Sequence, residues 1–257
     1  MDSVDRMGPP GAPMIVFIHG AGISRKLWQP QLEALSDDFR VVAPDLPGHG
    51  GRVSERFDFP VAVETVERHL AETDAECVVL VGQSLGGYVA SEVAARNPDR
   101  VSGLVLSGSS AEYHGWLGLK TAVSSLLFRL GARSRWIRNR FVASMHDRLQ
   151  SRPITDQQAT AIVDAGISLD AWGQSGRALV GFSLSDRLST YPGPVLLLNG
   201  ADDRLNRPAA SDRRDDVPRV STEVVADAGH TVNLERPRAY TEHVRRFAET
   251  CCEQNGA

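Results

Sequence analysis

The stretch that decides the fold is CVVLVGQSLGG, residues 77–87. Its first part, residues 77–81, is a short apolar run with the β-branched content of a buried strand. Gly82, Ser84 and Gly86 then form a G-x-S-x-G pattern that leads directly into a helical run. Glycines on either side of the serine let a strand and a helix approach closely around a sharp turn. The pattern therefore predicts a strand, a tight turn with Ser84 at its tip, and a helix.

Strand and helix candidates alternate on both sides of this motif. Five further apolar runs have strand character, and they cover residues 14–18, 40–43, 101–107, 194–199 and 221–227. Helical stretches fit between them at residues 27–35, 62–71 and 85–96, and from Pro237 toward Glu249. Continuous apolar strands separated by helices are typical of a sheet covered on both faces. We therefore predict an α/β fold with a doubly wound, mostly parallel sheet of about six strands.

One connection is far too long for a simple loop. Residues 108–193 separate two predicted strands and contain helix-like segments rich in Trp, Phe, Leu and Arg. We predict that residues 111–190 form a helical cap inserted into a core made of residues 1–110 and 191–257. The total of 257 residues suits one such core with an insertion.

Composition and charge exclude several classes of partner. The net charge of -4 provides no general basic field for nucleic acid, and no run of residues is apolar and long enough for a membrane span. The polar N-terminus lacks the apolar region of a signal peptide, so a cytoplasmic location is expected. The three cysteines, Cys77, Cys251 and Cys252, fit neither a disulfide framework nor a metal site and are expected to be free thiols. The oligomeric state is not predicted.

Two further glycine-containing turns extend the pattern set by the serine turn. His19-Gly20-Ala21-Gly22 follows the first predicted strand, and residues 45–50 read DLPGHG. Together with the G-x-S-x-G turn, these motifs resemble the serine-nucleophile branch of the α/β-hydrolase family, and the resemblance can be followed through most of the chain. It implies an oxyanion hole formed by the backbone amides of Ala21 and Leu85, with Gly22 as the alternative to Ala21. His19, His49 and Trp28 are expected to be structural.

The same resemblance implies a catalytic triad. A serine hydroxyl needs a general base and a group that orients the base. Asp203 lies in a G-x-x-D turn after the strand 194–199, and His230 lies in a Gly-His turn after the strand 221–227. The order Ser, Asp, His along the chain is the order of this fold. Ser84, Asp203 and His230 are therefore the expected triad, with Asp202 as the alternative acid.

The chain departs from the family pattern at its beginning. Family members commonly carry a strand hairpin before the first His-Gly strand, but the pair His19-Gly20 comes too early for two preceding strands. We therefore expect the hairpin to be missing.

The implied activity is hydrolysis of a carboxylic ester or lactone through an acyl-enzyme intermediate, with no metal and no cofactor, on a small ester-like substrate. Three alternatives remain open for the same triad: a thioester, a carbon–carbon bond, or cofactor-free perhydrolysis. A fourth is a ligand receptor on the same fold that turns over slowly.

The cap is expected to set the substrate. Trp116, Phe128, Phe141 and Trp172, together with Gly22, are the candidate substrate-binding residues. The cap also contains an arginine-rich segment, and its seven arginines are 129, 133, 135, 138, 140, 148 and 152. They form either a solvated helix face or a site for an anionic substrate or an anionic lipid surface.

Overall fold

The computed structural model describes residues 3–206 and 219–255. Seven strands form one sheet in the order β1-β3-β2-β4-β5-β6-β7. They are β1 (Val4–Met7), β2 (Met14–Ile18), β3 (Arg40–Pro44), β4 (Val78–Gln83), β5 (Gly103–Ser107), β6 (Val195–Gly200) and β7 (Val220–Val225). Strands β2 to β7 are parallel to their neighbours, and β1 pairs antiparallel with β3 at the edge. The predicted α/β class and the six parallel strands are confirmed.

The seventh strand, β1, was not predicted. Its sequence, VDRM, has no apolar pattern, and its side chains are half-buried or exposed. The strand exists because its backbone completes the ladder of β3, with Val4 opposite Pro44. Among the described residues, β1 therefore precedes β2 where no strand was expected.

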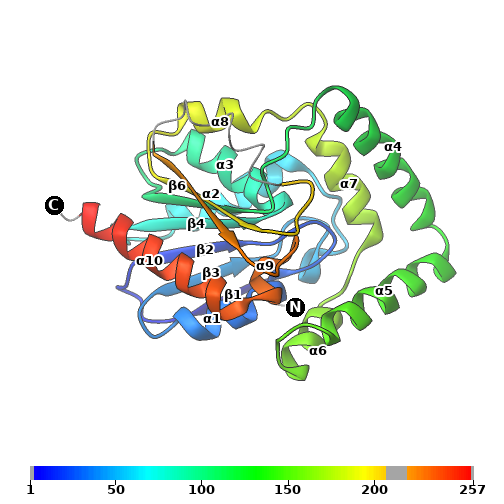
Figure 1. Ribbon diagram of the computed structural model, residues 1–257, viewed down its shortest axis with the longest axis horizontal. Coiled ribbons are helices and arrows are strands. Elements are labelled where there is room, and N and C mark those ends of the chain that lie inside the picture. The colour runs from blue at the N-terminus through cyan, green and yellow to red at the C-terminus, as the bar shows by residue number, and fades with distance from the viewer. Residues whose placement is uncertain (1–2, 207–218, 256–257) are drawn as a thin grey trace.

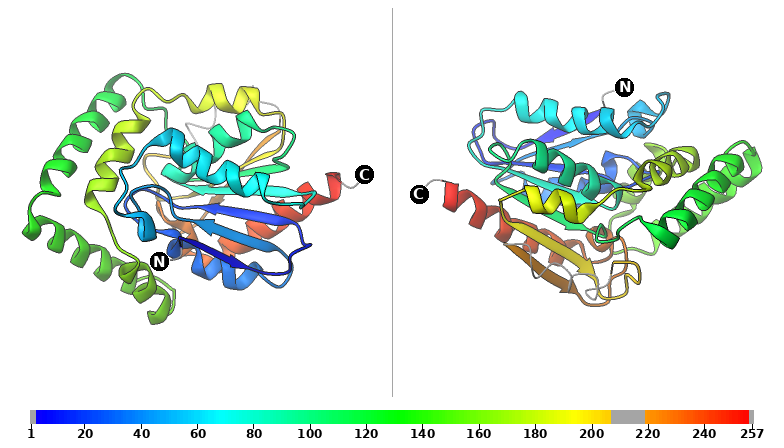
Figure 2. Two further views of the ribbon diagram at one scale, coloured as in Figure 1. Left: turned by 180° about the vertical axis from the view of Figure 1, so that it is seen from behind. Right: turned by 90° about the horizontal axis from the view of Figure 1, so that it is seen from above.

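Helices cover both faces of the sheet (Figures 1 and 2). The helices outside the long insertion are η1 (Arg25–Trp28), α1 (Gln29–Leu35), η2 (Gly50–Arg52), α2 (Phe59–Ala71), α3 (Leu85–Arg96), α9 (Val232–Glu235) and α10 (Pro237–Asn255). Alternate strand residues point to opposite faces, so Val16 and Leu80 pack in the core under α2 and α3. Phe17 and Val79 pack in the second core, under α1 and α10. Burial on both faces explains why the strands are continuous apolar runs.

The long insertion between β5 and β6 is helical. It contains α4 (Gly115–Gly131), α5 (Arg135–Gln150), α6 (Asp156–Asp164), α7 (Leu169–Leu179) and α8 (Leu184–Thr190). Figure 2 shows α4 as the outermost of these helices, with α7 between it and the core. Helix α8 instead packs on α3, where Leu184 and Leu188 belong to the buried core. The division into a core and a cap at residues 111 and 190 stays a prediction.

The expectation of three free thiols is wrong. Cys77, just before β4, forms a disulfide with Cys252 on α10. The two residues are separated by 175 positions, so no local spacing reveals the pair. Helix α10 runs beyond the predicted end at Glu249 and thereby brings Cys252 to the start of β4. Cys251 is a free, buried thiol.

No helix in the described part of the chain has the length and apolar character needed to cross a membrane.

Candidate active site

Ser84 occupies a strained turn between β4 and α3. Its φ of 52° and ψ of -119° lie in a region that a serine rarely adopts, and its N–H donates to the Ser107 carbonyl at 2.8 Å. The flanking glycines have no room for a side chain. A Cβ at Gly86 would lie 2.0 Å from the Ile18 oxygen, and one at Gly82 would lie 2.4 Å from the Gly86 oxygen. The packing of β4, α3 and β2 therefore fixes the serine turn at the carboxyl end of the sheet.

His230 and Asp203 lie together at the same end of the sheet. The Nδ1 atom of His230 is 2.8 Å from Oδ2 of Asp203. The Asp203 side chain is 5% exposed and that of His230 is 44% exposed. The carboxylate is therefore enclosed by protein, whereas the imidazole is partly open to solvent. The His230 carbonyl accepts a hydrogen bond from Nε2 of Gln83 at 3.2 Å. That bond ties the histidine loop to the residue immediately before Ser84.

Four hydrogen bonds surround the Asp203 carboxylate. Besides His230, the side-chain amide of Asn206 donates to Oδ2 at 3.0 Å, and the backbone N–H groups of Leu205 and Asn206 donate to Oδ1 at 3.1 and 3.3 Å. Burial alone raises the pKa of Asp203, but the hydrogen bonds and the charge of His230 outweigh it and lower the pKa below its ordinary value. Asp203 is therefore ionised at neutral pH. Asp202, the alternative acid, is exposed, and its N–H donates to the Ala228 carbonyl.

Sequence reasoning missed Asn206. Its side-chain oxygen accepts the N–H groups of Ser110 and Ala111 at 2.6 and 3.2 Å, while its amide nitrogen holds Asp203. It thus connects the acid turn after β6 to the loop after β5. Only its position three residues after Asp203 in the chain was available as a signal, and that spacing is not specific.

Sequence reasoning also missed Glu235. Its carboxylate accepts the Gly229 N–H at 2.6 Å, the Thr231 N–H at 3.2 Å and the Thr231 hydroxyl at 2.7 Å. These donors lie on either side of His230 in the chain. Arg152 lies 3.3 Å from the same carboxylate. Burial raises the pKa of Glu235, but the Gly229 amide, the Thr231 groups and Arg152 together lower it, so the loop is held by an ionised carboxylate.

The two expected oxyanion donors come from the segments that follow β4 and β2. Leu85 opens α3 directly after Ser84, and Ala21 follows the His19-Gly20 pair after β2. Neither backbone N–H donates a hydrogen bond to another described residue, and both residues line the same cavity as Ser84. The expected role of these two amides in holding an oxyanion stays a prediction.

His19 and His49, in the two glycine-containing turns, are buried and form hydrogen bonds with backbone groups. His19 accepts the Leu46 N–H on Nε2 at 3.0 Å, and its Nδ1 donates to the Gly20 carbonyl at 2.8 Å. Burial lowers the pKa of His19 to about 4 and that of His49 to about 3. Both are therefore neutral at pH 7, as suits structural residues.

A cavity of about 260 Å³ opens at Ser84 between the core and α4 and α7. Of the expected substrate-binding residues, Phe128 and Trp172 line it. Phe141 packs edge-on against Trp172 with ring centroids 5.7 Å apart, and Gly22 backs the same ring, since a Cβ there would lie 2.8 Å from it. Trp116 is 79% exposed and does not line the cavity. The remaining lining residues are Ala21, Leu85, Tyr113, Leu117, Lys120, Thr121, Ser124, Ser125, Ser175, Gly176, Leu179 and Leu205.

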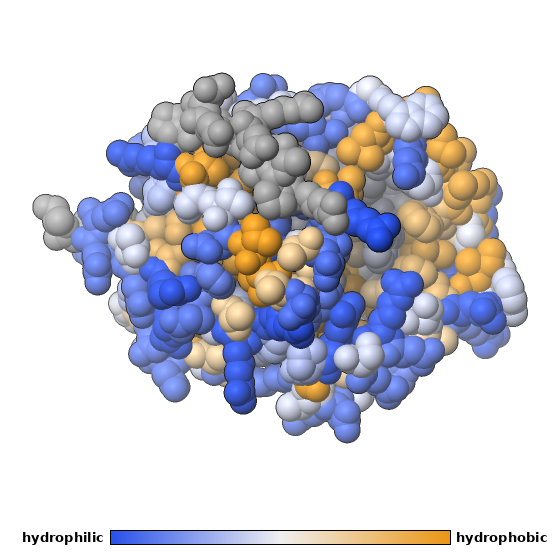
Figure 3. Space-filling view, in the orientation of Figure 1, coloured by the Kyte–Doolittle hydropathy of each residue, from blue (hydrophilic) through white to orange (hydrophobic). Residues whose placement is uncertain are grey.

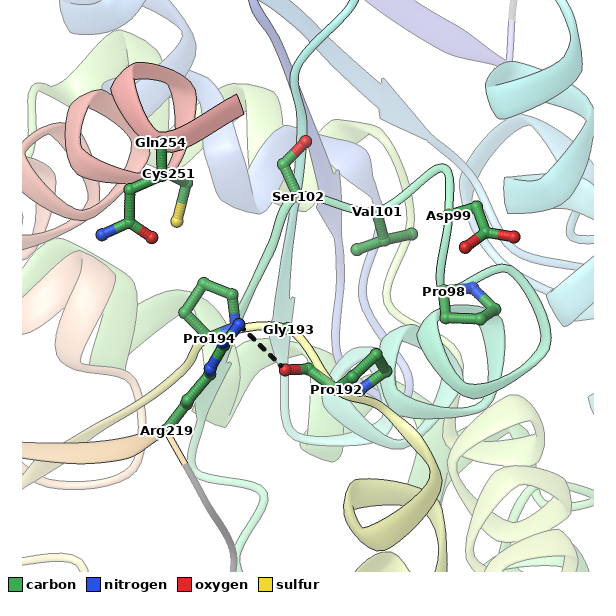
Figure 4. Close-up of a pocket in the computed structure, with 10 residues that line it drawn as sticks. All are labelled: Pro98, Asp99, Val101, Ser102, Pro192, Gly193, Pro194, Arg219, Cys251 and Gln254. Carbon is green, nitrogen blue, oxygen red and sulfur yellow. Dashed lines mark hydrogen bonds between the residues drawn. The ribbon is translucent and has the colours of Figure 1, made fainter. Parts of the chain in front are cut away.

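A second hollow, of about 460 Å³, lies away from this site (Figure 4). It is placed at the amino ends of β5 and β6, whereas Ser84 follows the carboxyl end of β4. Its lining includes the buried Cys251, whose pKa is raised to about 12 by burial, so the thiol is protonated. The hollow therefore offers no activated nucleophile. In the described part of the chain no cluster of three or more His, Cys, Asp or Glu side chains could hold a metal ion.

A parallel sheet with a strained serine turn and a His–Asp pair at its carboxyl edge is typical of α/β hydrolases. A sequence model of the alpha/beta hydrolase family matches residues 15–243, and the chain belongs to this family. The family and the fold expected from the motifs are confirmed.

Within this family, the chain is similar to proteins named as ester and lactone hydrolases. A pimeloyl-acyl-carrier protein methyl ester esterase of Pectobacterium atrosepticum is 30% identical over 91% of this chain and 94% of its own length. The 3-oxoadipate enol-lactonase 1 of Acinetobacter baylyi is 27% identical over 96% of this chain and 93% of its own length. Another methyl ester esterase, from Aliivibrio salmonicida, is 40% identical, but its alignment spans only 42% of that protein. These relatives support the expected ester-hydrolase class.

Among solved structures, a thermophilic esterase from Thermogutta terrifontis superposes with a TM-score of 0.77. It is 24% identical, and the match covers 97% of this chain and 93% of that one. This likeness supports the fold.

Proposed function

We propose that Ser84, His230 and Asp203 form the catalytic triad of a carboxylic-ester hydrolase that acts on a small ester or lactone. The observation that carries the proposal is the 2.8 Å contact between His230 and an enclosed, ionised Asp203 at the sheet edge that presents Ser84. A nucleophile on a strained turn, a base and an orienting acid are then supplied by three adjoining loops.

The mechanism follows from this arrangement. Asp203 accepts a hydrogen bond from the Nδ1–H of His230 and does not take the proton, so Nε2 is the basic nitrogen. Nε2 takes the Ser84 proton as the hydroxyl attacks the carbonyl carbon. The oxyanion accepts hydrogen bonds from the amides of Ala21 and Leu85. Protonated His230 gives its proton to the leaving alcohol, leaving an acyl ester on Ser84. Water, deprotonated by His230, releases the acid and restores the serine.

The cavity favours a short acyl group. Its volume of about 260 Å³ is below the range of roughly 300–1,000 Å³ that is usual for drug-sized ligands. Phe128, Trp172 and Leu179 supply apolar walls, and Thr121 and Ser124 supply hydroxyls. Lactones fit the same proposal because an enol-lactonase aligns with nearly the whole chain.

The test is hydrolysis of a p-nitrophenyl ester series of increasing chain length. We expect the highest kcat/KM for short acyl chains, and we expect a fluorophosphonate to label Ser84 in intact protein. Ser84→Ala should remove both turnover and labelling, whereas Ser54→Ala, at an exposed serine, should change neither. Full turnover by Ser84→Ala would refute the nucleophile assignment. Absence of any turnover by the wild type would favour a slow receptor on the same fold.

The cytoplasmic location expected from the sequence stays a prediction. Disulfides persist mainly in oxidising compartments, so the bond between Cys77 and Cys252 speaks against it. Alkylation of freshly released protein followed by intact-mass measurement distinguishes the two. One modified thiol under denaturing conditions supports an oxidised protein, and three modified thiols support a reduced one.

A further inference from the structure

Helix α4 has its apolar face turned outward. Its exposed side chains are the large apolar ones, namely Trp116, Leu119, Val123, Leu126, Leu127 and Leu130. Its inward face is mixed, with Gly118 and Ser125 buried and with Leu117, Thr121, Ser124 and Phe128 at the cavity. A surface helix of a globular protein normally shows the opposite arrangement. The exposed positions recur at helical spacing, so they form one continuous stripe.

Helix α5 adds positive charge and more apolar surface beside this stripe. Trp136 and Ile137 are exposed at its start. Of the seven arginines in residues 129–152, Arg129 faces Asp170 at 4.0 Å and Arg152 faces Glu235. The other five are exposed and have no acidic partner among the described residues, and they are Arg133, Arg135, Arg138, Arg140 and Arg148. The only acid in this segment is Asp147.

We call the two sets together the cap face: the exposed apolar residues of α4 and α5, and the five arginines. Figure 3 shows apolar side chains along the right-hand edge of the molecule, over α4, with hydrophilic side chains below them. All of these side chains are exposed, so nothing in the described chain covers this face.

We propose that the cap face binds the surface of an anionic lipid bilayer. Apolar side chains at helical spacing enter the boundary between headgroups and acyl chains, while neighbouring arginines pair with anionic headgroups. Two exposed tryptophans, Trp116 and Trp136, suit the interface between membrane and water. The chain lies on the membrane in this arrangement and does not span it.

Other occupants fit the cap face less well. A second copy of the same face would bring ten unpaired arginines together, and like charges oppose that contact. An acidic protein would neutralise the arginines, and a hollow of about 380 Å³ at Leu126, Leu130 and Arg133 could take one of its side chains. Trp116, Leu119 and Val123 extend the apolar stripe beyond this hollow and would stay uncovered by such a contact. A bilayer covers the apolar stripe with its acyl-chain boundary and pairs the arginines with its anionic headgroups at the same time.

Membrane binding by the cap face would place the bilayer close to the cavity at Ser84. The inward face of the same helix α4 lines the cavity at Leu117, Thr121 and Phe128. The bound membrane surface would therefore be separated by α4 from the cavity that Ser84 lines. Membrane binding itself does not depend on the proposed triad.

The experiment is flotation of the full chain with vesicles of phosphatidylcholine alone or containing phosphatidylglycerol. We expect flotation only with the anionic vesicles, decreasing as salt is raised, and a blue shift of tryptophan emission, since Trp116 and Trp136 are exposed while Trp28 is buried. Arg133 lines a hollow with Leu126 and Leu130, and Arg140 lies over the Trp136 ring, so both adjoin the apolar side chains. Arg133→Gln with Arg140→Gln should weaken partitioning roughly 30-fold, because each basic residue contributes about fivefold. Leu126→Gln with Leu127→Gln should weaken it at least about tenfold.

A control pair isolates the cap face. Arg56→Gln with Arg238→Gln removes two exposed arginines elsewhere and should weaken partitioning less than about threefold. The Leu126 and Leu127 variants should keep the turnover of a soluble short ester, since neither residue lines the cavity. Equal loss in the control and cap-face pairs would overturn the proposal. So would retention on poly-glutamate without vesicle binding, which indicates an acidic protein partner, or a dimer that Leu126→Gln dissociates.

Discussion

Replacing Glu235 by Ala tests whether this carboxylate positions His230. The change removes three hydrogen bonds, from the Gly229 amide and from the amide and hydroxyl of Thr231, and an ion pair with Arg152. Hydrogen bonds to a charged group contribute about 1.5–3 kcal/mol each. Water replaces part of this set because the loop is only half-buried, so we expect a net loss of roughly 3 kcal/mol. In a chain of this size that corresponds to a Tm lower by about 6–12 °C.

Activity should fall as well, because the freed loop lets the imidazole move away from Ser84. A displacement of about 1 Å costs on the order of 100-fold in rate. We expect kcat to fall about 10- to 100-fold while KM for a short ester changes little, measured well below the reduced Tm. Glu249→Ala, at an exposed glutamate of α10, is the matched control and should leave both quantities unchanged.

The effect of Glu235 on stability also depends on pH, with a defined sign. The folded state lowers the pKa of Glu235 below its ordinary value of 4.5. Its contribution is therefore fully present above that value and is lost as pH falls through the lower folded pKa. The difference in Tm between wild type and Glu235→Ala should shrink in acid. A variant that loses stability but keeps full kcat would show that Glu235 supports the fold without positioning the histidine.

Three other changes follow from the contacts of the site and the fold. Asp203→Asn should lower kcat by roughly 10³- to 10⁴-fold in ester hydrolysis by favouring the wrong imidazole tautomer, whereas Asp202→Asn should cost less than about threefold; equal losses would contradict the choice of acid. Gly86→Ala should destabilise by several kcal/mol, about 3 or more, because its Cβ would lie 2.0 Å from the Ile18 oxygen, and urea unfolding measures this. Cys77→Ser should lower the free energy of unfolding by about 2–5 kcal/mol, and reductant should have the same effect on the wild type only.

The fold was predictable wherever one local pattern carried the information. The apolar runs at residues 14–18 and 194–199 have strand character because both faces are buried, and the serine turn needs glycines in fixed positions. Strand β1 was not predicted because it forms through backbone hydrogen bonds to β3 at the edge of the sheet, and such pairing requires no apolar pattern in its side chains. The disulfide was not predicted because it too depends on a long-range contact: its two cysteines come together only when α10 packs against the sheet.

At the candidate site, the residues of the proposed triad were predictable from the sequence, but the residues that hold them in place were not. Ser84 and His230 lie in glycine-marked turns, and the structure brings the expected Asp203 to the histidine. Asn206 and Glu235 act through backbone contacts with loops from other strands, so neither has a local signature. The sequence also did not distinguish the cap residues that line the cavity from those that do not. Phe128 and Trp172 reach the cavity and Trp116 does not, a difference set by how α4 packs on α7.

The two places where this chain breaks a local rule bear on function in the same way. Ser84 adopts a backbone conformation that a serine avoids, and the surrounding packing of Gly82 and Gly86 maintains it. Helix α4 exposes leucines that a surface helix would bury, and its inward Ser125 lies against Gly173 and Gly176 of α7. Neither departure improves the stability of the isolated chain, so each requires another reason for being kept. In the proposed function the strained serine has that reason in a carbonyl substrate, and in the proposed membrane binding the exposed stripe of α4 has it in the bilayer surface that covers the stripe.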